Sequence, residues 1–310
     1  MKPLNILVSL TNDDNDYQVE QAKAAEEAAR RLGVKLQIVY ADNDSITQSQ
    51  QLLKVIQSPS GSHPDGIIFE PVGSTALPKV AQAAASANIA WVVLNSDADY
   101  VKPMRQQGRV PVFTITSDHQ EIGRIQGRQL AALLPQGGSV LYIHGPAENP
   151  AAKLRASGMY QTKPEQVQVK VLKGQWTEAS ACKAVTSWLR LSTSFQTHFD
   201  VIAAQDDSMA VGAKRAFQDL PNSSSRDRWL SLPFIGCDGL PATGQAWVRS
   251  GLLAATIYIP PNTGLALELL ADALRAGVMP PEVTFTTAQS YPDFDVLGEA
   301  QAEKARILSL

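Results

Sequence analysis

The sequence predicts an α/β fold built from two doubly wound parallel sheets. Short apolar runs rich in β-branched residues alternate with longer amphipathic segments rich in Ala, Leu, Gln and Glu, which is the pattern of parallel strands joined by crossover helices. Runs such as IAWVVL at residues 89–94 lack the alternation of a half-exposed strand, so helices should cover both faces of each sheet and Trp91 should lie in a core. The 310 residues suffice for two domains of roughly 150 residues.

Each expected strand is a short apolar or β-branched run. The runs are 6–10 (ILVSL), 36–40 (LQIVY), 66–70 (GIIFE), 90–95 (AWVVLN), 112–116 (VFTIT), 139–144 (SVLYIH), 167–172 (VQVKVL), 201–205 (VIAAQ), 234–237 (FIGC) and 254–259 (AATIYI). The expected helices span 17–32, 46–57, 75–88, 119–134, 147–162, 178–191, 208–220 and 263–276. Gly33 can stop the first helix, Ser74 or Thr75 can cap the third, and Pro135 ends the fourth. The polar stretch 222–228 is expected to be a surface loop.

The charge balance argues against nucleic acid and membrane partners. Twenty-seven Lys and Arg face 30 Asp and Glu, for a formal net charge of −3, so no global field attracts phosphate backbones or anionic lipid. No run approaches the ~18 uninterrupted apolar residues of a membrane span. Residues 1–8 lead directly into the first strand without a signal-peptide core. The compartment is therefore left open between the periplasm, if a leader has been removed, and the cytoplasm.

Polar side chains gather directly after several expected strands. Asn15 and Tyr17 follow the first strand, Asn95 ends the fourth, Asp206 follows the eighth and Asp238 the ninth. In doubly wound sheets ligands bind beyond the carboxyl ends of the strands, and Asp and Asn side chains suit the hydroxyls of a polyhydroxylated molecule. Each residue taken alone is equally compatible with a turn or a helix cap.

The usual catalytic and cofactor motifs are absent. The sequence has no GxGxxG after a strand, no phosphate-binding GxxxxGK, no GxSxG and no HExxH. The acidic stretch 13–16 fails as an EF-hand because Gln18 and Ala24 stand where Gly and Glu are required. The sequence therefore predicts no catalytic residues, no cofactor and no metal site, and a protein that is not an enzyme; the alternative is a hydrolase assembled from dispersed Asp and Arg residues, which would leave no such motif.

A series of motifs in order along the chain resembles the ribose- and galactose-type periplasmic binding proteins of type I, and the related effector domains of the Lac repressor family. The motifs are PDGIIFEP at 64–71, ANIAWVVLN at 87–95, TSD at 116–118, RASG at 155–158, AQDDSMAVGA at 204–213 and GCDG at 236–239. The resemblance implies two interleaved lobes joined by three crossings near Ser117, Pro260 and Tyr291. The N-terminal lobe would comprise residues 1–117 and 260–290, and the C-terminal lobe residues 118–259 and 291–310.

The resemblance also implies a ligand site in the cleft between the lobes, which hinge closure would bury. Tyr17 and Trp176 would stack on the ligand, Arg155 would donate to its oxygens, and the carboxylates would accept from its hydroxyls. The implied ligand-binding residues are Asn15, Tyr17, Asn95, Ser96, Arg155, Trp176, Asp206 and Asp238.

Three of these residues have structural alternatives. Tyr17 could be the first core residue of its helix, Trp176 could cover a loop, and Arg155 could form a surface ion pair with Glu148. Relatives that bind aldoses often have an Asp-Arg pair where this chain has Asn95-Ser96, and a Gln where it has Ile259. The ligand should therefore be less hydroxylated than ribose, or oriented differently.

Two functions follow from the resemblance. The first is non-enzymatic binding of a monosaccharide or a similar small molecule, as the solute-binding component of an ABC transporter whose membrane subunits would be its partners. The second is ligand sensing on behalf of a regulatory partner. A helix-turn-helix module of ~50 to 60 basic residues would mark a DNA-binding repressor, and none precedes Leu4.

Overall fold

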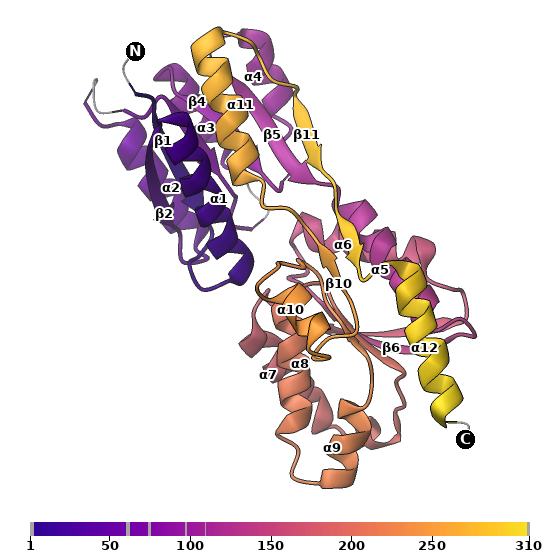
Figure 1. Cartoon of the computed structure of the whole chain (residues 1–310). Coiled ribbons are helices and arrows are strands. Elements are labelled where there is room, and N and C mark those ends of the chain that lie inside the picture. The colour runs from indigo at the N-terminus through magenta and orange to yellow at the C-terminus, as the bar shows by residue number, and fades with distance from the viewer. Residues whose placement is uncertain (1–2, 60–62, 74–75, 97, 109, 309–310) are drawn as a thin grey trace. The chain divides into compact units, whose positions relative to one another are not determined.

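The computed structural model describes residues 3–59, 63–73, 76–96, 98–108 and 110–308. The chain forms two compact units (Figure 1). Unit 1 comprises Met1–Ser117 and Pro261–Thr286, and unit 2 comprises Asp118–Pro260 and Thr287–Leu310. The chain passes from one unit to the other three times. The third crossing falls between Thr286 and Thr287, earlier than the expected position near Tyr291, because residues 289–291 pair with a strand of unit 2.

Unit 1 contains a six-stranded parallel sheet. Its strands lie in the order β11-β5-β4-β3-β1-β2 and every pairing is parallel. The strands are β1 (Asn5–Leu10), β2 (Lys35–Tyr40), β3 (Gly66–Phe69), β4 (Ala90–Leu94), β5 (Val112–Ser117) and β11 (Val283–Thr286). Strand β11 follows most of unit 2 in the sequence. The sheet of unit 1 is therefore complete only when segments from both ends of the chain pair with each other.

Helices cover both faces of this sheet, as the continuous apolar strands predict. On one face α1 (Asp16–Leu32) and α11 (Thr263–Ala276) lie side by side and pack Ala25, Leu267 and Leu270 onto the strands. The other face carries α2 (Ser45–Ile56), α3 (Pro78–Ser86) and α4 (Val101–Gln107). Gly33 ends α1 with φ 64°, as expected. The caps expected for α3, Ser74 and Thr75, lie outside the described residues, and that helix begins at Pro78.

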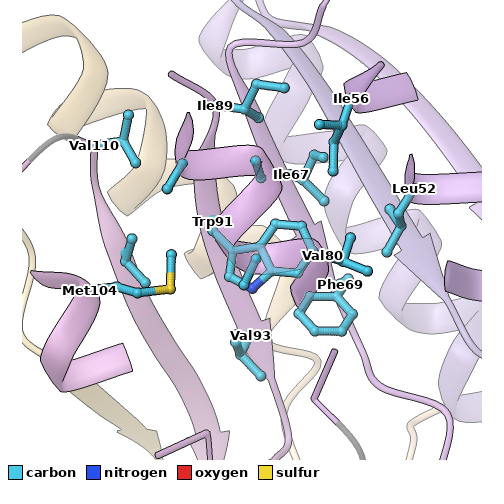
Figure 2. Packing of buried hydrophobic residues seen from close by; sticks show 14 of the residues in the cluster. Leu52, Ile56, Ile67, Phe69, Val80, Ile89, Trp91, Val93, Met104 and Val110 are labelled. Atoms are coloured by element: carbon cyan, nitrogen blue, oxygen red, sulfur yellow. The ribbon is translucent and has the colours of Figure 1, made fainter. Parts of the chain in front are cut away.

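Trp91 lies at the centre of the second core of unit 1 (Figure 2). Its side chain is fully buried and its ring centroid lies 4.6 Å from that of Phe69. The indole Nε1 donates to the hydroxyl of Tyr100 at 3.0 Å, so the one polar atom of the ring is satisfied. The prediction that Trp91 belongs to a core is confirmed.

Unit 2 repeats the plan with a smaller sheet. Four parallel strands lie in the order β7-β6-β8-β9: β6 (Gly138–His144), β7 (Val167–Lys173), β8 (Val201–Ala204) and β9 (Phe234–Ile235). A separate antiparallel pair joins β10 (Thr256–Tyr258) to β12 (Gln289–Tyr291). The helices of unit 2 are α5 (His119–Leu133), α6 (Pro150–Thr162), α7 (Glu178–Leu189), α8 (Asp207–Gln218), α9 (Ser223–Leu230), α10 (Gly244–Arg249), α12 (Phe294–Leu308) and the 3₁₀ turn η1 (Ser192–Gln196).

The expected loop at residues 222–228 is wrong, because most of it belongs to α9. Asn222 caps this helix by accepting from the backbone N–H of Ser225 at 3.2 Å. At the other end Trp229 is buried and stacks on Phe217, with ring centroids 5.0 Å apart. Packing of Trp229 therefore stabilises a helix in a polar segment. A prediction from local composition alone does not detect this packing.

No helix within the described residues combines the length and the apolar composition needed to cross a bilayer.

Candidate functional site

The strand orders place one topological switch point in each unit. In unit 1 the chain crosses from β1 to β2 on one side of β1 and then returns from β2 to β3 on the other side. In unit 2 it crosses from β6 to β7 and then returns to β8 on the other side of β6. Ligands of doubly wound sheets bind beyond the carboxyl ends of the strands at such points. The relevant segments are those that follow β1, β3 and β4 in unit 1 and β6, β8 and β9 in unit 2.

Three of the predicted site residues meet at this end of the unit 2 sheet. The guanidinium Nη1 of Arg155 lies 3.8 Å from the Oδ1 of Asp238, and its Cζ lies 5.4 Å from the centre of the Trp176 ring. Arg155 is only 8% exposed, so its charge is balanced by a carboxylate and an aromatic face rather than by bulk water. We call Arg155, Trp176 and Asp238 the unit 2 cluster.

The alternative surface position for Arg155 is wrong. Glu148, its proposed partner, pairs instead with Lys153 at 3.5 Å. Arg155 faces inward because α5 and α6 pack with their backbones in near contact at Gly123 and Gly158. A methyl group at Gly123 would overlap the carbonyl oxygen of Arg155, and one at Gly158 would overlap that of Gln120. The glycines therefore set how far Arg155 reaches over the sheet.

Gln205, which sequence reasoning did not single out, holds the floor of the unit 2 cluster. It is fully buried; its Nε2 donates to the Tyr142 hydroxyl and to the carbonyl of Ala152, both at 2.9 Å, and its Oε1 accepts from the N–H of Gly145 at 2.8 Å. Its own carbonyl accepts from Nη1 of Arg155. The signal in the sequence is an amide at the end of an otherwise apolar strand.

Asp207, a polar residue after the eighth expected strand that was not predicted to contact the ligand, fixes the turn that carries Asp238. Its Oδ2 accepts from the N–H of Gly239 at 2.8 Å and its Oδ1 from the Thr256 hydroxyl at 2.6 Å. Asp238 itself has φ 105°, a conformation rarely adopted by residues other than glycine. Asp207 thus holds the backbone directly after Asp238, and the N–H of Asp238 itself donates to the carbonyl of Ile257 at 2.9 Å. These bonds stabilise the strained position of Asp238.

Asp206 and Asn15 both serve as helix caps, which was the structural alternative for such residues. Asp206 is buried, and its Oδ1 accepts from the N–H of Met209 at the start of α8. Asn15 accepts from the N–H groups of Tyr17 and Gln18 at the start of α1, at 2.9 and 3.3 Å. Capping fixes the orientation of each side chain at the start of the helix that follows its strand.

The two aromatic candidates occupy different settings. Trp176 has φ 60° and packs against the core that α7 and α8 help to form. Its ring lies so close to Gly145 that a Cβ there would overlap it. Its position is thus part of the unit 2 structure as well as of the cluster. Tyr17 is partly exposed and is not among the described members of either core of unit 1.

Asn95 is held by a buried polar network in unit 1. Its Oδ1 accepts from the Nδ2 of Asn262 at 2.7 Å, and the Oδ1 of Asn262 accepts from the Nε2 of Gln21 at 2.8 Å. Asn262, Gln21 and Thr263 are fully buried, and the Oε1 of Gln21 also accepts from the N–H groups of Asn262 and Thr263. Gln21 and Asn262 were not predicted, because they become neighbours only in the folded sheet. Ser96 follows Asn95 and is partly buried.

Asn262→Ala is expected to weaken ligand binding about tenfold without removing a predicted ligand contact, because Asn95 would lose the donor that orients its amide. The measurement is an equilibrium titration with the best ligand found. Thr263→Val is the matched control, since it removes bonds from the Thr263 hydroxyl to Gln21 but none to Asn95. Equal affinity losses in the two variants would refute the positioning role of Asn262.

The thiol of Cys237 lies beside the unit 2 cluster, 3.6 Å from the Nη1 of Arg155. Burial raises the pKa of the Cys237 thiol, with the Arg155 guanidinium opposing that effect, so the thiol stays protonated at neutral pH and is a poor nucleophile. Burial also raises the pKa of Tyr142. Among the described residues, no group of three or more His, Cys, Asp and Glu side chains is placed to hold a metal ion.

Comparison with known proteins agrees with this fold and these motifs. Residues 6–277 match the family model described as a periplasmic binding protein domain. The chain belongs to the periplasmic binding protein family. This confirms the resemblance to type I periplasmic binding proteins, and the match covers most of both units.

Similar periplasmic binding proteins match nearly end to end. The D-allose-binding periplasmic protein of Escherichia coli (strain K12) is 26% identical over 280 residues, covering 88% of this chain and 86% of that protein. A ribose import binding protein of Bacillus subtilis (strain 168) is 27% identical over 278 residues, covering 88% and 83%. The crystal structure of a galactofuranose binding protein has a TM-score of 0.79 at 20% identity, covering 98% and 99%. The predicted α/β class with two parallel-sheet lobes is confirmed.

Proposed function

We propose that this chain binds a monosaccharide or a similar polyhydroxylated molecule and releases it unchanged. The observation that carries the proposal is the unit 2 cluster, in which a buried guanidinium, a carboxylate and an indole face meet beyond the carboxyl ends of the sheet. An arginine fork donates to hydroxyl oxygens, a carboxylate accepts from hydroxyls, and an aromatic face covers the C–H side of a sugar ring. The allose, ribose and galactofuranose specificities of the similar proteins support this class of ligand.

Eight side chains are proposed to contact the ligand, four from each unit. In unit 2, Arg155 donates, Asp206 and Asp238 accept, and Trp176 stacks. In unit 1, Tyr17 supplies the second aromatic face while the amides and the hydroxyl complete the polar contacts. The unit 1 residues are Asn15, Tyr17, Asn95 and Ser96. A ligand that contacts both units would stabilise a closed state. The size of that stabilisation equals the difference between the ligand's binding free energies in the closed and open states.

Two departures from the aldose-binding pattern constrain the ligand. Asn95 and Ser96 carry no charge, and Ile259, which stands where aldose-binding relatives often have Gln, is only 1% exposed. A charged or bidentate contact is thereby lost at each place. We infer a ligand with fewer hydroxyls than ribose, or one presented in another orientation, such as a deoxysugar or a furanose.

We further propose that the three crossings at 117–118, 260–261 and 286–287 act as the hinge. The role that fits such a protein is solute capture for an ABC transporter, with the membrane subunits of that transporter as partners and the periplasm as its compartment. The names of the similar proteins, a periplasmic protein and an import protein, support this role. No step of it needs a cofactor or a catalytic residue.

A thermal-shift panel of pentoses, hexoses, furanose-forming sugars, deoxysugars, polyols and nucleosides tests the proposal. A true ligand at one hundred times its dissociation constant is expected to add about 2.7 kcal/mol to the free energy of unfolding. NMR of the recovered ligand should show it unchanged after prolonged incubation. A panel without any shift would overturn the sugar class, and a chemically altered ligand would overturn the non-enzymatic function.

A further inference from the structure

The side chain of Gln205 lies between two of the groups proposed to bind the ligand. Gln205 directly follows β8 and is fully buried. A buried amide is costly unless its hydrogen-bonding groups are satisfied, and the bonds of this amide go to Gly145, Ala152 and Tyr142, around the unit 2 cluster. The placement of these partners therefore depends on Gln205.

The chemistry of its partners fixes the orientation of this amide. The N–H of Gly145 can only donate, so the atom 2.8 Å from it is Oε1. The carbonyl of Ala152 can only accept, so the atom 2.9 Å from it is Nε2. The Tyr142 hydroxyl, 2.9 Å from the same Nε2, takes the second amide hydrogen. A flipped amide would set donor against donor at Gly145 and acceptor against acceptor at Ala152.

Two bonds from Gln205 act on Arg155. The first is the bond from Nε2 to the carbonyl of Ala152, which lies one turn before Arg155 on α6 and ties this helix to the end of β8. The second runs from the Nη1 of Arg155 to the backbone carbonyl of Gln205. That carbonyl is held in place because the N–H of Gln205 donates to the carbonyl of Ile143 at 3.0 Å. The helix and the guanidinium are thus both anchored to one residue.

A further bond acts on Trp176. Gly145, whose N–H donates to the Oε1 of Gln205, packs so closely against the indole that a Cβ on Gly145 would lie 2.5 Å from two ring atoms. The place of Gly145 therefore limits where the indole can lie. Gln205 supports both the donor and the aromatic face of the unit 2 cluster.

We propose that Gln205 is a positioning residue for ligand binding, which holds the guanidinium of Arg155 in the orientation that the ligand requires. This inference rests on the proposed sugar site. An arginine side chain has considerable rotamer freedom, and a donor that is already oriented in the free protein loses less of that freedom on binding. Loss of the amide should therefore reduce affinity through Arg155, although Gln205 itself does not contact the ligand.

Side-chain ¹⁵N relaxation of the ligand-free protein tests the positioning without any sugar. The Nε–H of Arg155 is expected to have an order parameter of about 0.85 in the wild type and below about 0.6 in Gln205→Met. Gln126→Met is the matched control, because Gln126 is 2% exposed and donates to the carbonyl of Ala204 at 2.7 Å. It should leave the Arg155 signal unchanged. An equally rigid Arg155 in wild type and Gln205→Met overturns the proposal.

A double-mutant cycle with the best sugar separates positioning from a general structural role. Gln205→Met should weaken binding about tenfold in the wild-type background and less than about threefold in the Arg155→Ala background, because its effect passes through that side chain. A structural role alone predicts the same loss in both backgrounds, and that result overturns the proposal. A panel without any bound sugar would overturn the proposed function and leave the relaxation result valid.

Tyr142→Phe is the second variant, used if circular dichroism shows that Gln205→Met does not fold. It removes the hydroxyl that the Nε2 of Gln205 contacts and keeps the fully buried ring. It should weaken binding about fivefold in the wild-type background and less than about twofold in the Arg155→Ala background. Equal losses in the two backgrounds overturn the proposal here as well.

Discussion

Arg155→Ala is expected to weaken binding of the ligand at least about one hundredfold, the largest functional effect of any single substitution in the chain. The guanidinium pairs with Asp238, donates to the carbonyl of Gln205 and lies over Trp176. Truncation removes the proposed donor to the ligand and also leaves a nearly buried carboxylate without its cation. An equilibrium titration of wild type and variant with the same ligand measures the loss.

Two further variants separate this role from a general effect on α6. Lys153→Ala, on the same helix, removes only the exposed pair with Glu148 and should bind as the wild type does. Arg155→Lys keeps the charge but loses the planar fork, so its affinity should fall between those of wild type and Arg155→Ala. Binding by Arg155→Ala within about threefold of wild type would show that Arg155 does not contact the ligand.

Gly158→Ala is expected to lower the free energy of unfolding of unit 2 by about 3 kcal/mol, at the upper end of the range for overpacking. Its Cβ would overlap the carbonyl oxygen of Gln120 and crowd the backbone of Arg124. Backbone atoms cannot rotate away as a flexible side chain can, so α5 and α6 must separate. Urea denaturation followed by tryptophan fluorescence measures the change.

Gly298→Ala, in α12, is the matched control. A Cβ there meets no other atom within 4 Å, so the substitution should be neutral or should stabilise the helix by about 0.5–1 kcal/mol. Because Gly158 lies on the helix that carries Arg155, Gly158→Ala should also reduce ligand affinity, while Gly298→Ala should not. Equal stability of the two alanine variants would contradict the close packing of α5 and α6.

The predicted strands and helices match the structure where the local sequence pattern agrees with the burial of the segment in the fold. The strand at 90–95 was predicted from a continuous apolar run and is fully buried over Ala90–Leu94. β11 was missed, because its residues alternate between exposed and partly buried and become a strand only by pairing with β5, far away in sequence. α9 was missed for a related reason, since its anchor Trp229 packs on partners that local composition does not reveal.

In the candidate site too, some residues could be predicted from the sequence and others could not. Asp238 was predicted from its place after a strand and from a family motif, whereas Arg155 and Trp176 were predicted from the family resemblance. The structure brings the three together. The residues that hold candidates in place were not predicted. Gln21 and Asn262 are 241 residues apart in sequence, and neither belongs to a recognisable motif. Such supporting contacts depend on which segments the sheet order makes neighbours, and a single sequence does not display that order.

Isothermal titration with the best sugar from the panel tests the central claim most directly. Wild-type protein is expected to bind one ligand per chain, and both Tyr17→Ala in unit 1 and Asp238→Ala in unit 2 should reduce the affinity at least about tenfold while leaving the stoichiometry unchanged. One site that draws on both units predicts that result. Undiminished binding after either substitution, or no heat with any sugar, would contradict it.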